Sequence, residues 1–182
     1  MTITLTPLVA PIVLSFVLLA SSTVHTPRPI HQVTPFGDVL VSERLDPRAY
    51  TGSGTYRMFV PPLAFDGEEV EAYQYWNAGD LAPQWVEVDL GRTEGVTRLR
   101  LVVAMLPDGD ATHEVWVSNQ PIQEDLSAAT KLHIFQGPMT DRQVLELKLE
   151  SPWAARYVQV RTIASPSWVA WMEVQVFAAP AL

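Results

Sequence analysis

The sequence predicts an all-β fold, an antiparallel jelly-roll β-sandwich, and three observations lead to this prediction. Short runs rich in Val, Leu, Ile, Phe and Trp recur from residue 85 to residue 177. Pro, Gly, Asp or Ser residues bound these runs, as turns between strands require. No stretch beyond residue 25 has the 3.6-residue period of a long amphipathic helix. Regular short strands separated by turn signals are typical of sandwiches and barrels.

The strand pattern is clearest in residues 85–90, where apolar residues alternate with Glu87 and Asp89. Such alternation buries one face of a strand and exposes the other. A turn at residues 107–110, Pro-Asp-Gly-Asp, follows the next run. The predicted strands occupy residues 85–90, 96–105, 113–118, 131–136, 143–149, 156–163 and 169–177.

Composition limits the class of protein. The 182 residues suffice for one domain and an extra segment, and 48% of them are hydrophobic, enough for a substantial core. The net charge of −8 excludes the cationic surface of a nucleic-acid-binding protein. The sequence has no Cys, so it forms no disulfide and no thiolate site.

The N-terminus is apolar and without charge through residue 22. One interpretation is a secretory signal peptide, with Ala20, Ser21 and Ser22 as the cleavage region. The other is an uncleaved transmembrane anchor, a hydrophobic helix over residues 3–24. Both send the remaining chain across a membrane and predict an extracytoplasmic location.

Three segments follow from these observations. Residues 1–24 are the signal peptide or anchor, and residues 25–54 are a Pro-rich linker or arm. The sandwich occupies residues 55–178.

No catalytic pattern stands out in the sequence. It lacks G-x-S-x-G, and His25, His31, His113 and His133 are too dispersed for a clustered metal site. We therefore predict a protein that is not an enzyme.

Three motifs resemble a known family. They are Ala64-Phe-Asp-Gly67, the stretch from Tyr75 through Trp76-Asn77 to Gly91, and the run over residues 168–177. Together they are similar to the discoidin, or coagulation factor 5/8 type C, family, which overlaps the galactose-binding-like carbohydrate-binding modules. The resemblance covers residues 55–178 and implies a module that binds rather than catalyses, through loops at one end of the sandwich.

Five residues are candidates for ligand contact. A sugar ring needs a flat apolar surface and polar partners for its hydroxyls, which aromatic and amide or imidazole side chains supply. Trp76 and Trp168 lie at loop-to-strand junctions, with Asn77 and Ser167 beside them, and His113 opens a strand. The alternative interpretation makes Trp76 a structural plug of the sandwich and His113 a structural residue.

The acidic cluster that begins at Asp66 suggests a metal. The family resemblance implies one structural calcium at an Asp-Gly turn facing a Glu near the C-terminal strand, which here are Asp66 and Glu173. The alternative is a solvated acidic loop.

These observations predict an exported or membrane-tethered module that recognises a glycan or another cell-surface component. The alternative is a single-span accessory subunit of a membrane protein complex, whose sandwich docks on partner subunits.

Overall fold

The computed structural model describes residues 33–69 and 74–180, and this part of the chain is built almost entirely from antiparallel strands. The predicted all-β antiparallel sandwich is confirmed. The predicted N-terminal helix, signal peptide and anchor lie outside the described residues. In chain order the elements are β1 (Val39–Leu40), the 3-10 turn η1 (Pro47–Ala49), β2 (Tyr50–Gly52), the 3-10 turn η2 (Pro61–Ala64), β3 (Trp76–Asn77), β4 (Gln84–Ala104), β5 (Gly109–Ser118), β6 (Thr130–Met139), β7 (Val144–Ala164) and β8 (Ala170–Ala178).

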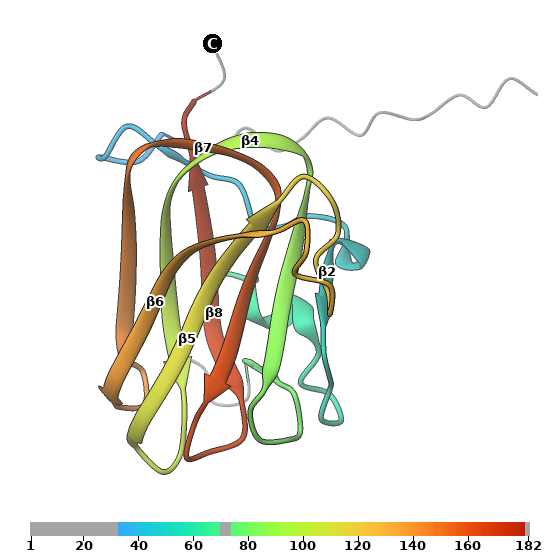
Figure 1. Cartoon of the computed structure of the whole chain (residues 1–182), viewed down its shortest axis with the longest axis vertical. Helices are drawn as coiled ribbons and strands as arrows, with labels where there is room; N and C mark the ends of the chain where they lie inside the picture. The colour runs from blue at the N-terminus through green and yellow to red at the C-terminus, as the bar shows by residue number, and fades with distance from the viewer. Residues whose placement is uncertain (1–32, 70–73, 181–182) are drawn as a thin grey trace, which may run out of the picture. The chain divides into compact units, whose positions relative to one another are not determined.

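Two long bent strands create the two layers. β4 and β7 have 21 residues each and pair with each other along most of their length, with a register shift after Asp89. Their bends lie at the same end of the molecule, so each strand contributes one half to each sheet (Figure 1). Strands β2, β5 and β6 extend one sheet, while β8 with β1 and β3 extends the other. The sequence predicts both halves of each long strand as separate runs but not their continuity.

The core lies between the sheets and follows the predicted alternation. Along β4, Val86, Val88 and Leu90 are buried, as are the residues of the second half that face the same core. Trp76, Trp171 and Phe65 are the largest side chains that are fully buried. Each such side chain stabilises the fold by roughly 1.5–3 kcal/mol relative to an exposed one.

The segment before the predicted boundary at residue 55 is part of this fold. Val39 pairs with Ala178 and Tyr50 pairs with Val88, so β1 extends one sheet and β2 extends the other. Arg98 of β4 donates to Asp38 at 2.9 Å, and its guanidinium lies 3.5 Å from the ring centre of Phe177. The sandwich therefore includes residues that the sequence predicts as linker.

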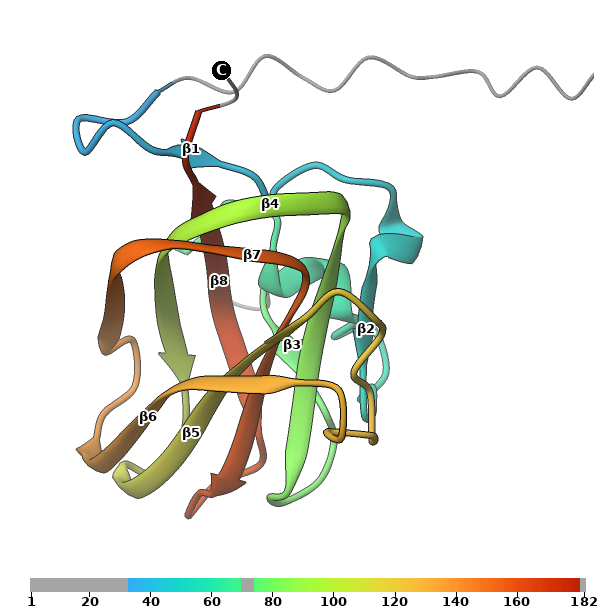
Figure 2. The same ribbon diagram turned by 45° about the horizontal axis from the view of Figure 1, so that its top comes forward.

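The two ends of the sandwich differ. β8 carries the chain from Ala170, beside the connecting loops, to Ala178, beside β1 (Figure 2).

Among the described residues, no helix has the length and apolar character needed to cross a bilayer.

Candidate functional site

A pocket of about 730 Å³ opens at the end of the sandwich where the loops gather. Its walls come from the connections on either side of β4, from the β6–β7 connection and from the β7–β8 connection. Loops held by a rigid sheet scaffold are a common location for binding residues. The lining residues are Tyr75, Asn77, Leu81, Ala104, Met105, Leu106, Pro107, Asp141, Arg142, Pro166, Ser167, Trp168, Ala170 and Met172.

Trp168 is the principal aromatic residue of this pocket. It is 47% exposed, and its ring meets that of Tyr56 edge-on at a centroid distance of 5.2 Å. The adjacent Ser167 is buried and its Oγ donates to the carbonyl of Trp168 at 3.0 Å. The next amide, of Val169, donates to the carbonyl of Asp80 at 3.0 Å. The loop thus holds a large, partly exposed aromatic surface in a fixed position.

Polar groups of the pocket are also held in place. Asp141 Oδ1 accepts from the amide of Met105 at 3.1 Å, and Arg142 Nη1 donates to the carbonyl of Glu69 at 2.6 Å. Asn77 Oδ1 accepts from the amide of Gly79 at 2.8 Å. An amide, a carboxylate and a guanidinium together offer both donors and acceptors, which recognition of sugar hydroxyls requires.

Sequence reasoning missed several lining residues. Asp141 and Arg142 lie in a connection that carries no motif, and Leu106, which is 88% exposed, precedes the predicted turn at residues 107–110. That turn was the one available signal, because it marks a loop at the end of the sandwich.

The five predicted ligand residues divide into two groups. Asn77, Ser167 and Trp168 line the pocket. Trp76 is fully buried, and its Nε1 donates to the carbonyl of Gly54 at 3.0 Å. Its indole fills the interior between the sheets, the position that the alternative interpretation gives it.

His113 is the other residue that the fold places inside. Its Nδ1 lies 2.9 Å from Thr162 Oγ1, and its ring meets Trp171 edge-on at 4.7 Å. Burial lowers the pKa of His113 to about 4, so the imidazole is neutral at physiological pH. Its side chain is 4% exposed and does not line the pocket.

The predicted metal residues meet in a second location, at the Asp66–Gly67 turn. Glu173 is fully buried, and its Oε2 accepts from the amide of Gly67 at 3.1 Å. Its Oε1 has no hydrogen-bond partner among the described residues. Burial, with the nearby carboxylates of Glu43 and Asp66, raises the pKa of Glu173 to about 9.

The oxygen donors of this cluster are of the kind that calcium prefers, but too few of them point toward one position to hold the ion. Carboxylate oxygens are the ligands it prefers, and a cation would relieve the partnerless Oε1 of Glu173. Yet Asp66 Oδ1 already accepts from the amide of Glu68 at 3.0 Å. Within residues 33–69 and 74–180, no three acidic or histidine side chains are close enough to hold a metal ion. An ion bound here would have to draw further oxygens inward.

Comparisons with known proteins agree with this architecture. A family model described as F5/8 type C domain matches residues 48–174. The comparison with curated protein sequences found no significant match.

Solved structures share the fold at low sequence identity. The family 32 carbohydrate-binding module of C. perfringens NanJ in complex with galactose has a TM-score of 0.59 and 15% identity, covering 77% of this chain and 98% of that chain. A Streptococcus pneumoniae fucose-binding module has a TM-score of 0.58 and 17% identity, covering 78% and 96%. Chitosan-binding module 1 of a Paenibacillus sp. IK-5 chitosanase/glucanase has a TM-score of 0.56 and 20% identity, covering 75% and 97%.

Proposed function

Because the chain belongs to the F5/8 type C domain family, we propose that it is a non-catalytic module that binds a glycan in the pocket at the loop end of the sandwich. The observation that carries the proposal is Trp168, 47% exposed on a fixed loop at the wall of the 730 Å³ pocket. An indole at the wall of a pocket offers the flat surface on which a pyranose ring stacks.

The polar lining supports a sugar rather than a purely apolar ligand. Asn77, Asp141 and Arg142 supply donors and acceptors in positions fixed by their own hydrogen bonds. Three structures of similar fold are named for galactose, fucose and chitosan. We propose a pyranose in contact with Trp168, with its hydroxyls directed to these three side chains.

Export is part of the same proposal. The uncharged apolar composition of residues 1–24 supports secretion or tethering to a membrane, with the sandwich outside the cytoplasm. N-terminal sequencing of the mature protein tests this directly. A mature chain that retains Met1 and fractionates without membrane would contradict it.

A docking role on partner subunits of a membrane complex is the second candidate. The end away from the pocket exposes Phe36 at 67% and Trp153 at 44%, a surface that a partner protein would cover. Binding of a glycan to the isolated protein would favour the first function over this one.

The test compares two tryptophans of similar exposure. Trp168 lines the pocket, whereas Trp153 pairs with Val96 near Ala178, at the other end of the sandwich. Wild-type protein is screened on a glycan array, and hits are measured by calorimetry. We expect Trp168→Ala to weaken binding at least tenfold and Trp153→Ala to leave it unchanged, with both variants folded. Equal effects of the two substitutions, or no glycan bound by wild type, would overturn the proposal.

A further inference from the structure

A tight turn beside the pocket carries two side chains, Arg57 and Met58, that do not line the pocket. The amide of Phe59 donates to the carbonyl of Tyr56 at 3.0 Å, which places Arg57 and Met58 at the tip. The amide of Tyr56 donates to the carbonyl of Asn77, a pocket residue, at 2.8 Å. The turn is therefore fixed relative to the pocket.

Arg57 has an unusual conformation within this turn. Its φ of 54° lies in the left-handed region, which is unfavourable for a residue with a long side chain. Among the described residues, Arg44, Gln123 and Arg142 also have a positive φ, and of these Arg142 lines the pocket.

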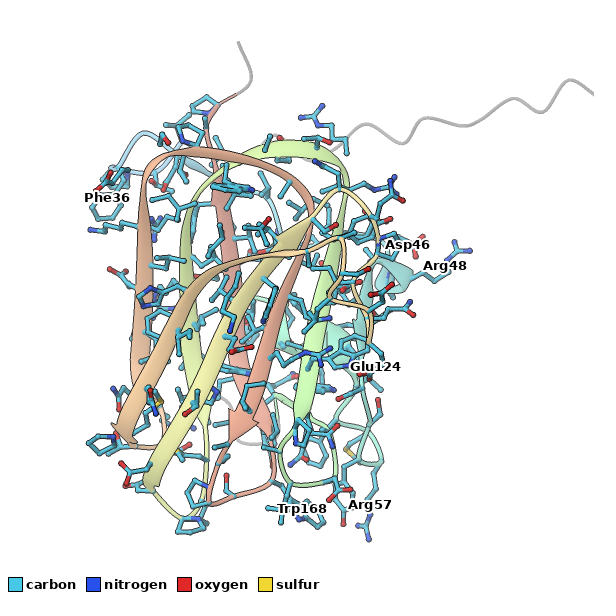
Figure 3. The ribbon with its side chains drawn as sticks, in the orientation of Figure 1. Phe36, Asp46, Arg48, Arg57, Glu124 and Trp168 are labelled. Carbon is cyan, nitrogen blue, oxygen red and sulfur yellow. The ribbon has the colours of Figure 1, made fainter. Side chains whose placement is uncertain are left out.

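The guanidinium of Arg57 lies in the open beside an aromatic surface. It lies 5.0 Å from the ring centre of Tyr56, and that ring contacts Trp168. Figure 3 shows Arg57 and Trp168 at the same end of the sandwich. Among the described residues, no carboxylate lies within ion-pair distance of Arg57.

We propose that the glycan site extends past Trp168 onto Tyr56 and Arg57, and that its ligand is an oligosaccharide with an anionic substituent, a carboxylate or a sulfate, on the sugar next to the one in the pocket. This inference rests on the proposed function. A guanidinium binds such groups through paired charge-assisted hydrogen bonds, and the contact of Tyr56 with both Arg57 and Trp168 places that guanidinium next to the pocket aromatic.

The charge of the protein explains why the anion must be part of a larger ligand. The net charge is −8, so a free anion gains little from one exposed guanidinium. A sugar held in the pocket presents its neighbour to Arg57 at high effective concentration. Charges beyond about 8 Å are screened at physiological salt, so the local contact with Arg57 dominates.

The experiment uses three ligands with the same linkage: a β-linked galactose disaccharide, its sulfate ester on the second sugar, and the disaccharide in which galacturonic acid replaces the second sugar. We expect one or both anionic ligands to bind roughly tenfold more tightly than the neutral one, as a charge-assisted contact provides. We expect this preference to decrease as salt is raised. Equal affinity for all three ligands, or no binding of any of them, would overturn the inference; the proposed function stands or falls separately, on the glycan array.

Variants of Arg57 separate its charge from its role in the fold. Arg57→Gly removes the guanidinium and relieves the left-handed strain, so the fold should be retained or more stable. We expect it to lose the anionic preference while keeping wild-type affinity for the neutral disaccharide, and Arg57→Lys to restore part of the preference. Arg48→Gln is the control, because Arg48 is also exposed but lies away from Trp168 (Figure 3). An anionic preference that persists in Arg57→Gly would contradict the inference.

Discussion

The carboxylate of Glu173 accepts a hydrogen bond from the amide of Gly67 at 3.1 Å, while its other oxygen is buried with no partner among the described residues. A charged group in this position would be poorly solvated and would face the carboxylates of Glu43 and Asp66. Two species relieve this cost. One is a proton on Glu173, and the other is a cation between the carboxylates.

Protonation of Glu173 makes stability depend on pH. Its pKa is raised from 4.5 to about 9 on folding, so between these values only the folded state holds the proton. The stabilising contribution is present below pH 4.5 and is lost as pH rises toward 9, at no more than about 1.4 kcal/mol per pH unit.

Glu173→Gln should remove this dependence. The amide keeps an acceptor for the amide of Gly67 and cannot ionise, so we expect the variant to be more stable than wild type at pH 8. Urea denaturation of both proteins from pH 5 to pH 9 measures the difference. Parallel curves for the two proteins would contradict the raised pKa of Glu173.

His113 should give a dependence of opposite sign. Burial lowers its pKa from 6.5 to about 4, so between these values only the unfolded state takes up the proton. Its contribution to stability is therefore present above pH 6.5 and is lost as pH falls toward 4. From pH 4.5 to pH 6.5 it opposes the contribution of Glu173. We expect the stability of His113→Gln to fall more steeply than that of wild type as pH rises across this interval, whatever its absolute stability.

Calcium at the Asp66–Glu173 cluster stays a proposal, because an ion there needs oxygens beyond those that converge in the described residues. It requires an ionised Glu173, so the rise in melting temperature with added calcium should be larger at pH 8 than at pH 6. At a concentration about 100 times its Kd, calcium would add roughly 2.7 kcal/mol. Glu173→Gln should abolish the shift, and Glu150→Gln, an exposed substitution elsewhere, should keep it. Equal melting temperatures in calcium and chelator would contradict calcium binding at this cluster.

Truncation of Trp76 and of Trp168, the two tryptophans at loop-to-strand junctions, should change the stability of the fold by different amounts. Trp76 is fully buried and bonded to Gly54, so Trp76→Ala should cost about 3–5 kcal/mol. Trp168 is half-exposed, and Trp168→Ala should cost about 1 kcal/mol, mostly from its contact with Tyr56. Thermal unfolding of both variants measures this contrast. Similar losses of stability would contradict the assigned positions.

Local periodicity was enough to predict the layers of this protein but not how its strands bend. The alternation in residues 85–90 and 96–105 predicts two strands, and both are present as halves of β4. Whether a strand continues through Gly91 and Glu94 depends on its pairing with β7. That pairing joins residues far apart in the sequence, so local periodicity does not reveal it. β1 and β2 are too short to have a period, so residues 39–52 were predicted as part of a linker or arm.

The pocket residues were predicted only where they stand at a loop-to-strand junction. Trp168, Ser167 and Asn77 were chosen for that position and for their aromatic or polar side chains, and all three line the pocket. Trp76 differs from Trp168 in burial alone, a property of the whole fold that neighbouring residues do not encode. Arg142 reaches the pocket because β6 and β7 end there, which depends on the order of strands in the sheet.

The pairing of Val39 with Ala178 has a practical consequence for handling this protein. The eight residue steps of β8 from Ala178 to Ala170 at the pocket span about 27 Å. A fluorophore, bead or fused reporter attached beyond either β1 or β8 would therefore sit at the pole remote from the loops. Immobilisation through these positions should leave the pocket facing solution, and arrays of such copies on one particle would reveal the proposed glycan binding by avidity even where each contact is weak.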